Sequence, residues 1–387
     1  MISENIVAFR NPAEIWQENW TFLIKESVTI VGALLTLFHA FKSGGRNLWL
    51  WVTCILHGVA VEIYSYELKD IDNFWHIQGT VMFFKKRFPL YIVCLYPYFI
   101  YTATMAVKRM RLPRWSESLA VGLAVVCIDL PYDITGVKLL WWTWHDTDPN
   151  VYDRMYYVPW TSYIFHASFA FSFNTVFNGL PKLLNMTTKE GERSTFRKEL
   201  TVSIATALFS FPMGVIQFVI FYHPLHDIWK VPTEVCCCLL LILGYCAIVW
   251  KNDKQTVGGS IKIDEIALVI FIHYTMYFFL NWFVQPEQLA ATGLHEPLGD
   301  CSKDAPILSA LGQMLPRKQY LCDKNYDEPF DFHCTQRPAD GVKWYTICGT
   351  PFTNRVEHCV VVSCISAFGL FIFKELLGRR EPKQKRN

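Results

Sequence analysis

Charged residues are scarce in this chain, at 18% of its 387 residues, whereas average chains carry about 25%. No basic stripe interleaved with aromatic residues is present, which argues against a nucleic-acid partner. No two histidines are four residues apart, so the histidine boxes of membrane desaturases and hydroxylases are missing. A phosphate-binding glycine loop and a Ser-His-Asp arrangement are lacking too. We therefore expect neither a metal nor another cofactor.

The first 19 residues are polar and lack the apolar core of a cleavable signal peptide. Beyond them, apolar runs of about 20 residues recur along the chain, and such runs predict membrane-spanning helices. The expected fold is all-α, a polytopic membrane helical bundle of about nine transmembrane helices. The predicted spans are 22–41, 47–66, 88–107, 117–141, 156–180, 199–222, 233–250, 263–285 and 357–376.

This pattern divides the chain into a bundle of eight spans (1–285), a loop (286–356), and a last span with a basic tail (357–387). The short connections on the side of the C-terminus carry fourteen lysines and arginines, and the opposite ones carry six. The positive-inside rule therefore predicts a cytosolic C-terminus and a luminal N-terminus. The cluster Lys85-Lys86-Arg87 opposes this orientation, unless its side chains snorkel or residues 67–87 form an interfacial segment.

The long connection 286–356 contains Cys301, Cys322, Cys334 and Cys348. Four cysteines in a polar loop of an oxidising compartment predict two disulfides, with the pairing left open. Reduced thiols in a cytosolic loop are one alternative. A zinc site is another, although no Cys-x-x-Cys spacing supports it.

Two short motifs concern location and modification. Lys383 and Lys385 fit the dilysine pattern by which a coat retrieves membrane proteins to the endoplasmic reticulum, and a plain basic tail is the alternative. The sequon that begins at Asn19 predicts a luminal glycan, at a position close to the bilayer.

Two aspartates, Asp129 and Asp133, interrupt the apolar span 117–141. Their spacing of four places both carboxylates on one helix face. An ionisable group at membrane depth costs about 2.5–3.5 kcal/mol on insertion scales, so such groups normally face a cavity and mark a functional site. Two like charges seldom both ionise in apolar surroundings, so we expect one of them to hold a proton and to suit acid catalysis or proton-coupled binding. Pro131 is expected to kink the span and free a backbone carbonyl.

Other polar and aromatic residues lie near this pair in the predicted bundle. Glu62 shares a helix face with Tyr66, and it acts either as an acid near neutrality or as an interhelical clamp. Trp142 and Trp144 are either interface anchors or the wall of a pocket that stabilises a cation. His166 is a further polar group at depth.

The order of these motifs resembles the membrane-bound carotenoid hydratases of the bisanhydrobacterioruberin hydratase type and related carotenoid biosynthesis proteins. The resemblance covers about 46–180, and it leaves out the cysteine loop, the last span and the tail. Two positions depart from the family pattern, because Ile134 replaces a proline and Ser162 replaces an asparagine. The matching motifs are Glu62 with Tyr64-Ser-Tyr66, Phe88-Pro89-Leu90, Asp129 with Asp133, Trp142-Thr-Trp144, and Tyr156-Tyr-Val158-Pro159.

That family hydrates a terminal isoprenoid double bond. The resemblance implies that Asp129 or Asp133 is the acid and that Glu62 orients water or acts as its partner. It also implies a substrate pocket, with the following candidate residues: Tyr64, Tyr66, Trp142, Trp144, Tyr157, Ser162 and His166.

Three functions stay open at this point. The first is an enzyme of the endoplasmic reticulum, a hydratase or isomerase that acts on an isoprenoid-type lipid. The second is a non-catalytic lipid-handling subunit, such as a scramblase or a partner of a lipid-transfer complex, with protein partners on its luminal or basic cytosolic loops. The third is a proton-coupled transporter, for which no inverted repeat is visible. Membrane lipids and the retrieval coat are the other expected partners.

Overall fold

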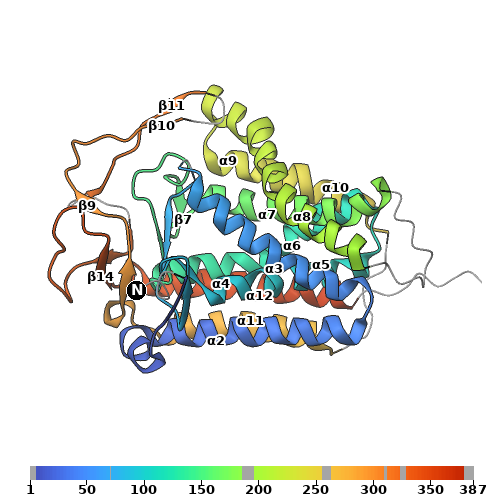
Figure 1. Cartoon of the computed structure of the whole chain (residues 1–387), viewed down its shortest axis with the longest axis horizontal. Helices are drawn as coiled ribbons and strands as arrows, with labels where there is room; N and C mark the ends of the chain where they lie inside the picture. The colour runs from blue at the N-terminus through green and yellow to red at the C-terminus, as the bar shows by residue number, and fades with distance from the viewer. Residues whose placement is uncertain are drawn as a thin grey trace, which may run out of the picture.

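The computed structural model describes residues 6–69, 71–184, 196–254, 263–308, 312–322 and 328–378. Within these ranges, eight helical spans are long and apolar enough to cross a membrane, and Figure 1 shows them packed as one bundle. The chain is therefore a polytopic helical bundle, as predicted. The spans are α2 (Pro12–Ser43), α3 (Arg46–Glu67), Leu90–Met110 with α4 (Leu90–Tyr96) and α5 (Thr102–Val107), α6 (Arg114–Lys138), Phe196–Ile228 with α8 (Phe196–Gln217), Thr233–Asn252 with α9 (Thr233–Cys238) and α10 (Ala247–Asn252), α11 (Glu265–Phe283) and α12 (Arg355–Leu377).

The fifth expected span is present as α7 (Trp160–Leu183), but this helix is not among the eight that are apolar enough. Its 24 residues include buried polar side chains at Ser162, Ser168, Ser172 and Asn174. It packs against α6 on one side and α8 on the other. Since its polar groups face protein, α7 does not need the hydropathy of a lipid-facing span.

Short strands form a cap over one end of the bundle, made of residues 7–9, 71–89 and 142–159. This cap was not predicted, because its pairs join segments that are distant in the sequence. β2 (Phe74–His76) pairs with β5 (Trp142–Trp144). The other strands are β1 (Val7–Phe9), which pairs with β3 (Val81–Phe83), β4 (Phe88–Pro89), which also pairs with β3, and β6 (Arg154–Met155), which pairs with β7 (Val158–Pro159).

The long connection forms an insertion, residues 286–354, on the outer side of the cap (Figure 1). Disulfides join Cys301 to Cys322 and Cys334 to Cys348, which confirms the two expected bridges and assigns their pairing. Its strands are β8 (Ala290–Leu294), β9 (Leu298–Gly299), β10 (Ile307–Leu308), β11 (Met314–Leu315), β12 (Leu321–Cys322), β13 (Phe330–Asp331) and β14 (Trp344–Gly349). They pair as β13-β14-β8, β9-β12 and β10-β11.

The N-terminal strand and the insertion lie at the same end of the bundle, and α12 runs from this end to the opposite one (Figure 1). The basic cluster that opposed the orientation is part of the cap. The Lys86 ammonium lies 5.0 Å from the centre of the Trp344 ring. The Arg87 guanidinium lies 4.2 Å from the Tyr66 ring and pairs with Asp72. The Lys86 and Arg87 side chains therefore contact aromatic rings of the protein. Snorkelling side chains would instead reach the lipid headgroups.

Asn19 is fully buried and breaks the helical conformation of α2. Its amide nitrogen donates to the Leu139 carbonyl at 2.7 Å, and its oxygen accepts from the Phe22 backbone N–H. Asn19 thereby caps the second part of α2, as an N-cap residue does. A glycan on this nitrogen would require the space next to Leu139, so the expected glycosylation is wrong for the folded chain. Lys383 and Lys385 lie outside the described residues.

Pro131 stands inside α6, which stays helical on both sides of it. Because proline has no N–H, the carbonyl four residues earlier, that of Cys127, loses its helical partner. The Tyr274 hydroxyl on α11 donates to this carbonyl at 2.9 Å. The expected free carbonyl is thus present, a neighbouring helix satisfies it, and α6 stays helical through the proline.

Tyr274→Phe should destabilise the bundle by about 1–3 kcal/mol, because it leaves the Cys127 carbonyl without a donor. Pro131→Ala restores the backbone N–H, so the same tyrosine substitution should cost less in that background. Thermal unfolding of the four purified proteins measures both effects. Equal costs in the two backgrounds would show that the tyrosine acts through packing alone.

A buried ion pair joins the insertion to the cap, with Arg154 Nη1 at 2.5 Å from Glu328 Oε1. Burial raises the pKa of the Glu328 carboxyl to about 8, and Arg154 opposes this effect only in part. The carboxyl therefore binds a proton more tightly in the folded protein than in the unfolded chain, whose pKa is about 4.3. This tighter proton binding stabilises the folded protein fully below about pH 4, and the stabilisation is lost as the pH rises to about 8.

Glu328→Gln removes this titration. The thermal unfolding midpoint of the wild type should therefore fall, relative to that of the variant, as the pH is raised from 5 to 8. Parallel midpoint curves for the two proteins would contradict the burial effect on Glu328.

Candidate functional site

A cavity of about 200 Å³ lies inside the bundle, beneath the cap. It is smaller than the pockets of about 300–1,000 Å³ that enclose whole drug-sized ligands, so it suits one end of a longer molecule. Strands β2 and β5 close its capped end, α3, α6, α7 and the span Leu90–Met110 form its sides, and α8 contributes Phe211. Aromatic side chains dominate the wall: Phe74, Tyr96, Phe99, Tyr132, Trp142, Trp144, Phe165, Phe169 and Phe211.

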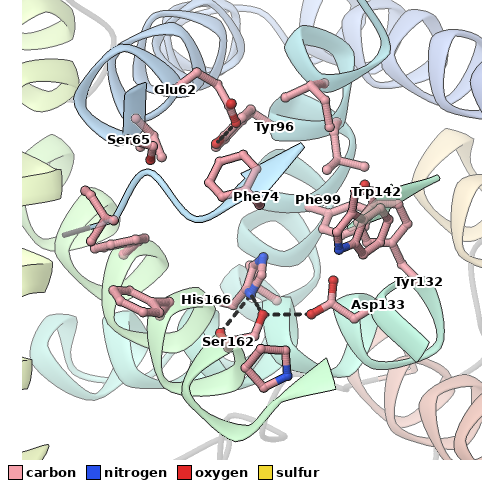
Figure 2. Close-up of a pocket in the computed structure, with 18 of the residues that line it drawn as sticks. Glu62, Ser65, Phe74, Tyr96, Phe99, Tyr132, Asp133, Trp142, Ser162 and His166 are labelled. Atoms are coloured by element: carbon pink, nitrogen blue, oxygen red, sulfur yellow. Dashed lines mark hydrogen bonds between the residues drawn. The ribbon is translucent and has the colours of Figure 1, made fainter. Parts of the chain in front are cut away.

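A cluster of titratable groups from α6 and α7 stands at one wall of the cavity (Figure 2). The Ser162 hydroxyl donates to Asp133 Oδ2 at 2.7 Å. His166 Nδ1 lies 3.2 Å from Asp129 Oδ2. Asp129 is fully buried, and neither of its carboxylate oxygens accepts a hydrogen bond from any described residue. The spacing prediction that both aspartates share one site is confirmed.

The basic residue that follows the aspartates along α6 does not neutralise them. Lys138 Nζ donates to the carbonyls of Thr350 and Pro351, at 3.0 and 3.1 Å. It therefore ties α6 to the start of α12, and Asp133 faces the cavity without an ion pair to it. Since buried carboxylates need compensation, protons or a bound cation remain to supply it.

The three side chains could also hold a divalent cation, because ligand atoms of Asp129, Asp133 and His166 lie within 4.8 Å of one another. However, His166 Nδ1 lies 2.9 Å from the carbonyl oxygen of Ser162. Since a carbonyl oxygen only accepts, Nδ1 carries the hydrogen and donates it, which leaves Nε2 as the ring nitrogen that could bind a metal. The same side chains can instead share protons, as two neighbouring buried carboxylates do.

Glu62 stands at the opposite wall of the cavity (Figure 2). The hydroxyl of Tyr66 donates to one of its oxygens at 2.8 Å, and that of Tyr96 donates to the other at 3.0 Å. His76 Nε2 lies 3.8 Å from the same carboxylate. The predicted contact with Tyr66 is confirmed. Tyr96 and His76 were missed, since nothing local in the sequence indicates that another helix and a cap strand reach this carboxylate.

The residues expected from the resemblance divide into those that line the cavity and those that do not. Asp129 and Tyr66 lie directly behind the wall, each in contact with a residue that lines it. Tyr64 does not line the cavity either. It is two residues from Glu62 and so points away from that carboxylate, and its ring stacks on Phe211, which lines the cavity. Tyr157 also lies outside, in the turn between β6 and β7. The residues that line the cavity are Glu62, Asp133, Trp142, Trp144, Ser162 and His166.

The two tryptophans are not membrane anchors, since β5 holds both against the cavity. The ring centroids of Trp142 and Tyr132 are 4.5 Å apart, and those of Trp144 and Phe74 are 6.0 Å apart. Gly136 on α6 makes this possible, because a Cβ at this position would lie 2.2 Å from the Trp142 ring. The pocket-wall alternative for these residues is therefore confirmed.

No curated protein and no solved structure matches the chain. The likeness to carotenoid hydratases over 46–180 stays a prediction. A family model described as a domain of unknown function, DUF7802, matches residues 1–377, which include the bundle, the cap and the insertion. The chain belongs to the DUF7802 family.

Proposed function

We propose that this protein is a lipid-acting enzyme of the endoplasmic reticulum membrane. It takes up the end of an isoprenoid or another unsaturated lipid and hydrates or isomerises a double bond by acid catalysis. The observation that carries the proposal is the cluster of Asp129, Asp133 and His166 at the wall of an aromatic cavity. A lipid chain reaches such a cavity from the bilayer, and its apolar end matches the aromatic wall.

The chemistry follows from how the groups are placed. The aspartate cluster donates a proton to one alkene carbon, and the π electrons form the new C–H bond, which leaves a carbocation at the neighbouring carbon. The faces of Tyr132, Trp142 and Trp144 stabilise this cation. Water then adds to the cation and loses a proton to Glu62, which gives an alcohol. Return of a proton from an adjacent carbon to the aspartate cluster gives the isomerised alkene instead.

The cellular setting belongs to the same proposal. The charge bias and the two disulfides support a luminal cap and insertion with a cytosolic C-terminus. Lys383 and Lys385 would then bind the retrieval coat. Membrane lipids supply the substrate, and the insertion or the basic cytosolic loops offer surfaces to a protein partner.

A second candidate is a non-catalytic lipid-handling subunit, a scramblase or a partner of a lipid-transfer complex. The observation that favours it is an apolar groove of about 420 Å³ between α2 and α11. Trp20, Phe271, Phe279 and Phe283 line this groove, which has the chemistry to hold an acyl chain. In this candidate the acidic cavity binds a lipid without changing it.

Asp129→Asn and Asp133→Asn should each abolish the reaction, since an amide cannot donate the proton and general acids contribute about 10²–10⁴-fold. Untargeted lipid mass spectrometry of deletion cells, rescued with each variant, measures this. A hydrated or double-bond-shifted lipid should appear with the wild type and with the control variant, and with neither Asp129→Asn nor Asp133→Asn. Asp304→Asn is the matched control, because Asp304 pairs with Lys318 on the exposed surface of the insertion. Rescue of the same lipids by all three variants would favour the second candidate.

Glu62→Gln should lower hydration by about 10²-fold, because the amide cannot take the proton from water. Isomerisation does not use this step, so the ratio of isomerised to hydrated product should rise. Tyr66→Phe removes one donor to Glu62 and should shift the ratio in the same direction, whereas Tyr64→Phe lies outside the cavity and should not. An unchanged ratio in Glu62→Gln would remove Glu62 from the mechanism.

A further inference from the structure

Residues 144–159, which we call the strap, run from β5 to α7 across the capped end of the cavity. Three of them, Trp144, Val151 and Pro159, line the cavity directly. Val151 is 3% exposed, so the strap and its surroundings shield this side chain from solvent. The strap is therefore the layer that separates the cavity from the space on the insertion side.

Three buried pairs of ionisable side chains hold the strap from its outer side, and each has one partner in the insertion. Arg154 meets Glu328 at 2.5 Å, and these side chains are 4% and 0% exposed. His145 Nε2 lies 2.8 Å from Glu296 Oε1, with both side chains buried. Asp148 pairs with Arg317 at 3.2 Å. The strap thus supplies one member of every pair, and three separate stretches of the insertion supply the others.

The disulfides keep these three stretches together. The bridge from Cys301 to Cys322 closes a loop that contains Arg317. The bridge from Cys334 to Cys348 ties β14 to the segment that follows Glu328. Each partner of the strap lies within six residues of one of these four cysteines in the sequence, so we expect reduction to loosen the segments that carry them.

The strap is attached differently at its other edge. Asp153 accepts a hydrogen bond from the Thr233 hydroxyl at the start of α9, at 2.6 Å. Between β6 and β7, Tyr156 and Tyr157 adopt φ angles of 50° and 68°, which side chains other than glycine rarely adopt. This turn is a conformation that surrounding contacts must maintain. The α9 edge can therefore act as a hinge, while the insertion edge acts as a latch.

We propose that the strap is a gate to the cavity and that the disulfide-bearing insertion latches it shut through buried charges. Water and small polar molecules pass when the latch releases the strap. The contacts between the strap and the insertion support the gate. Its role in supplying the water for hydration rests on the proposed function.

Accessibility of Val151 tests the gate without reference to activity. In a Val151→Cys protein in nanodiscs, we would measure labelling of residue 151 by a charged maleimide, with peptide mass spectrometry to separate it from the native thiols. Arg154→Glu and Glu328→Arg should each raise the labelling rate at least tenfold. The double reversal should return it toward the starting value, because it restores an ion pair of opposite polarity. Reduction of the disulfides should raise the rate as well.

Lys318→Glu is the matched control, since it reverses a charge of the insertion in an exposed pair with Asp304 and should leave the rate unchanged. A variant whose thermal unfolding midpoint collapses is replaced by Arg317→Gln, which removes one charge without reversing it. Equal labelling rates in folded single variants and the starting protein would overturn the proposal, as would a double reversal that labels as fast as either single one. The labelling response should persist in an Asp129→Asn background. The labelling rate thus tests the gate, and the lipid mass spectrum tests the acid chemistry, so either proposal can fail without the other.

Discussion

The carboxylates of Asp129 and Asp133 stand at membrane depth, where no bulk water solvates them, and the surrounding helices are arranged around this constraint. A polar group in such a place needs a partner inside the protein. On α7, Ser162 contacts Asp133 and His166 contacts Asp129. These polar residues lower the hydropathy of α7, which is not among the helices apolar enough to face lipid. The same rule explains why Tyr274 satisfies the carbonyl that Pro131 leaves free. The bundle therefore keeps these polar groups inside, where other protein groups contact them, and exposes apolar side chains on its outer surface.

The cap solves the corresponding problem at the end of the cavity. Helices alone would leave the carboxylates open to water along the bundle axis, whereas β2 and β5 bring Phe74, Trp142 and Trp144 across this opening. A reactive carbocation needs such shielding, since uncontrolled access of water quenches it. The insertion adds an outer layer that contacts the strap through charges, so the inner layer is aromatic and the outer layer is ionic. In the proposed function, the cap would shield the cation and the strap and insertion would control the entry of water.

The sequence predicted those features that depend on local spacing. The apolar runs predicted the spans, and the spacing of four predicted that Asp129 and Asp133 lie on one helix face. Four cysteines in a loop on the luminal side predicted two disulfides. Features that depend on distant contacts were missed or misplaced. The pairing of β2 with β5, the approach of His76 to Glu62 and the burial of Asn19 by Leu139 have no local signal. Tyr157 was misplaced because a short turn, with positive φ, interrupts what reads as the start of a helix.

The two walls of the cavity differ in a way that assigns direction to the proposed chemistry. Two tyrosine hydroxyls donate to Glu62, an arrangement that suits a carboxylate which receives a proton. Asp129 accepts no hydrogen bond from the described residues and lies beside a second carboxylate, an arrangement that suits a carboxyl which gives one up. In the proposed mechanism an alkene in the cavity meets Asp133, which lies next to Asp129, on one side and water beside Glu62 on the other. A simple lipid-binding cavity gains nothing from carboxylates at both walls, because each adds a desolvation cost without adding apolar contact. This asymmetry is the physical reason to prefer the enzyme over the passive lipid carrier.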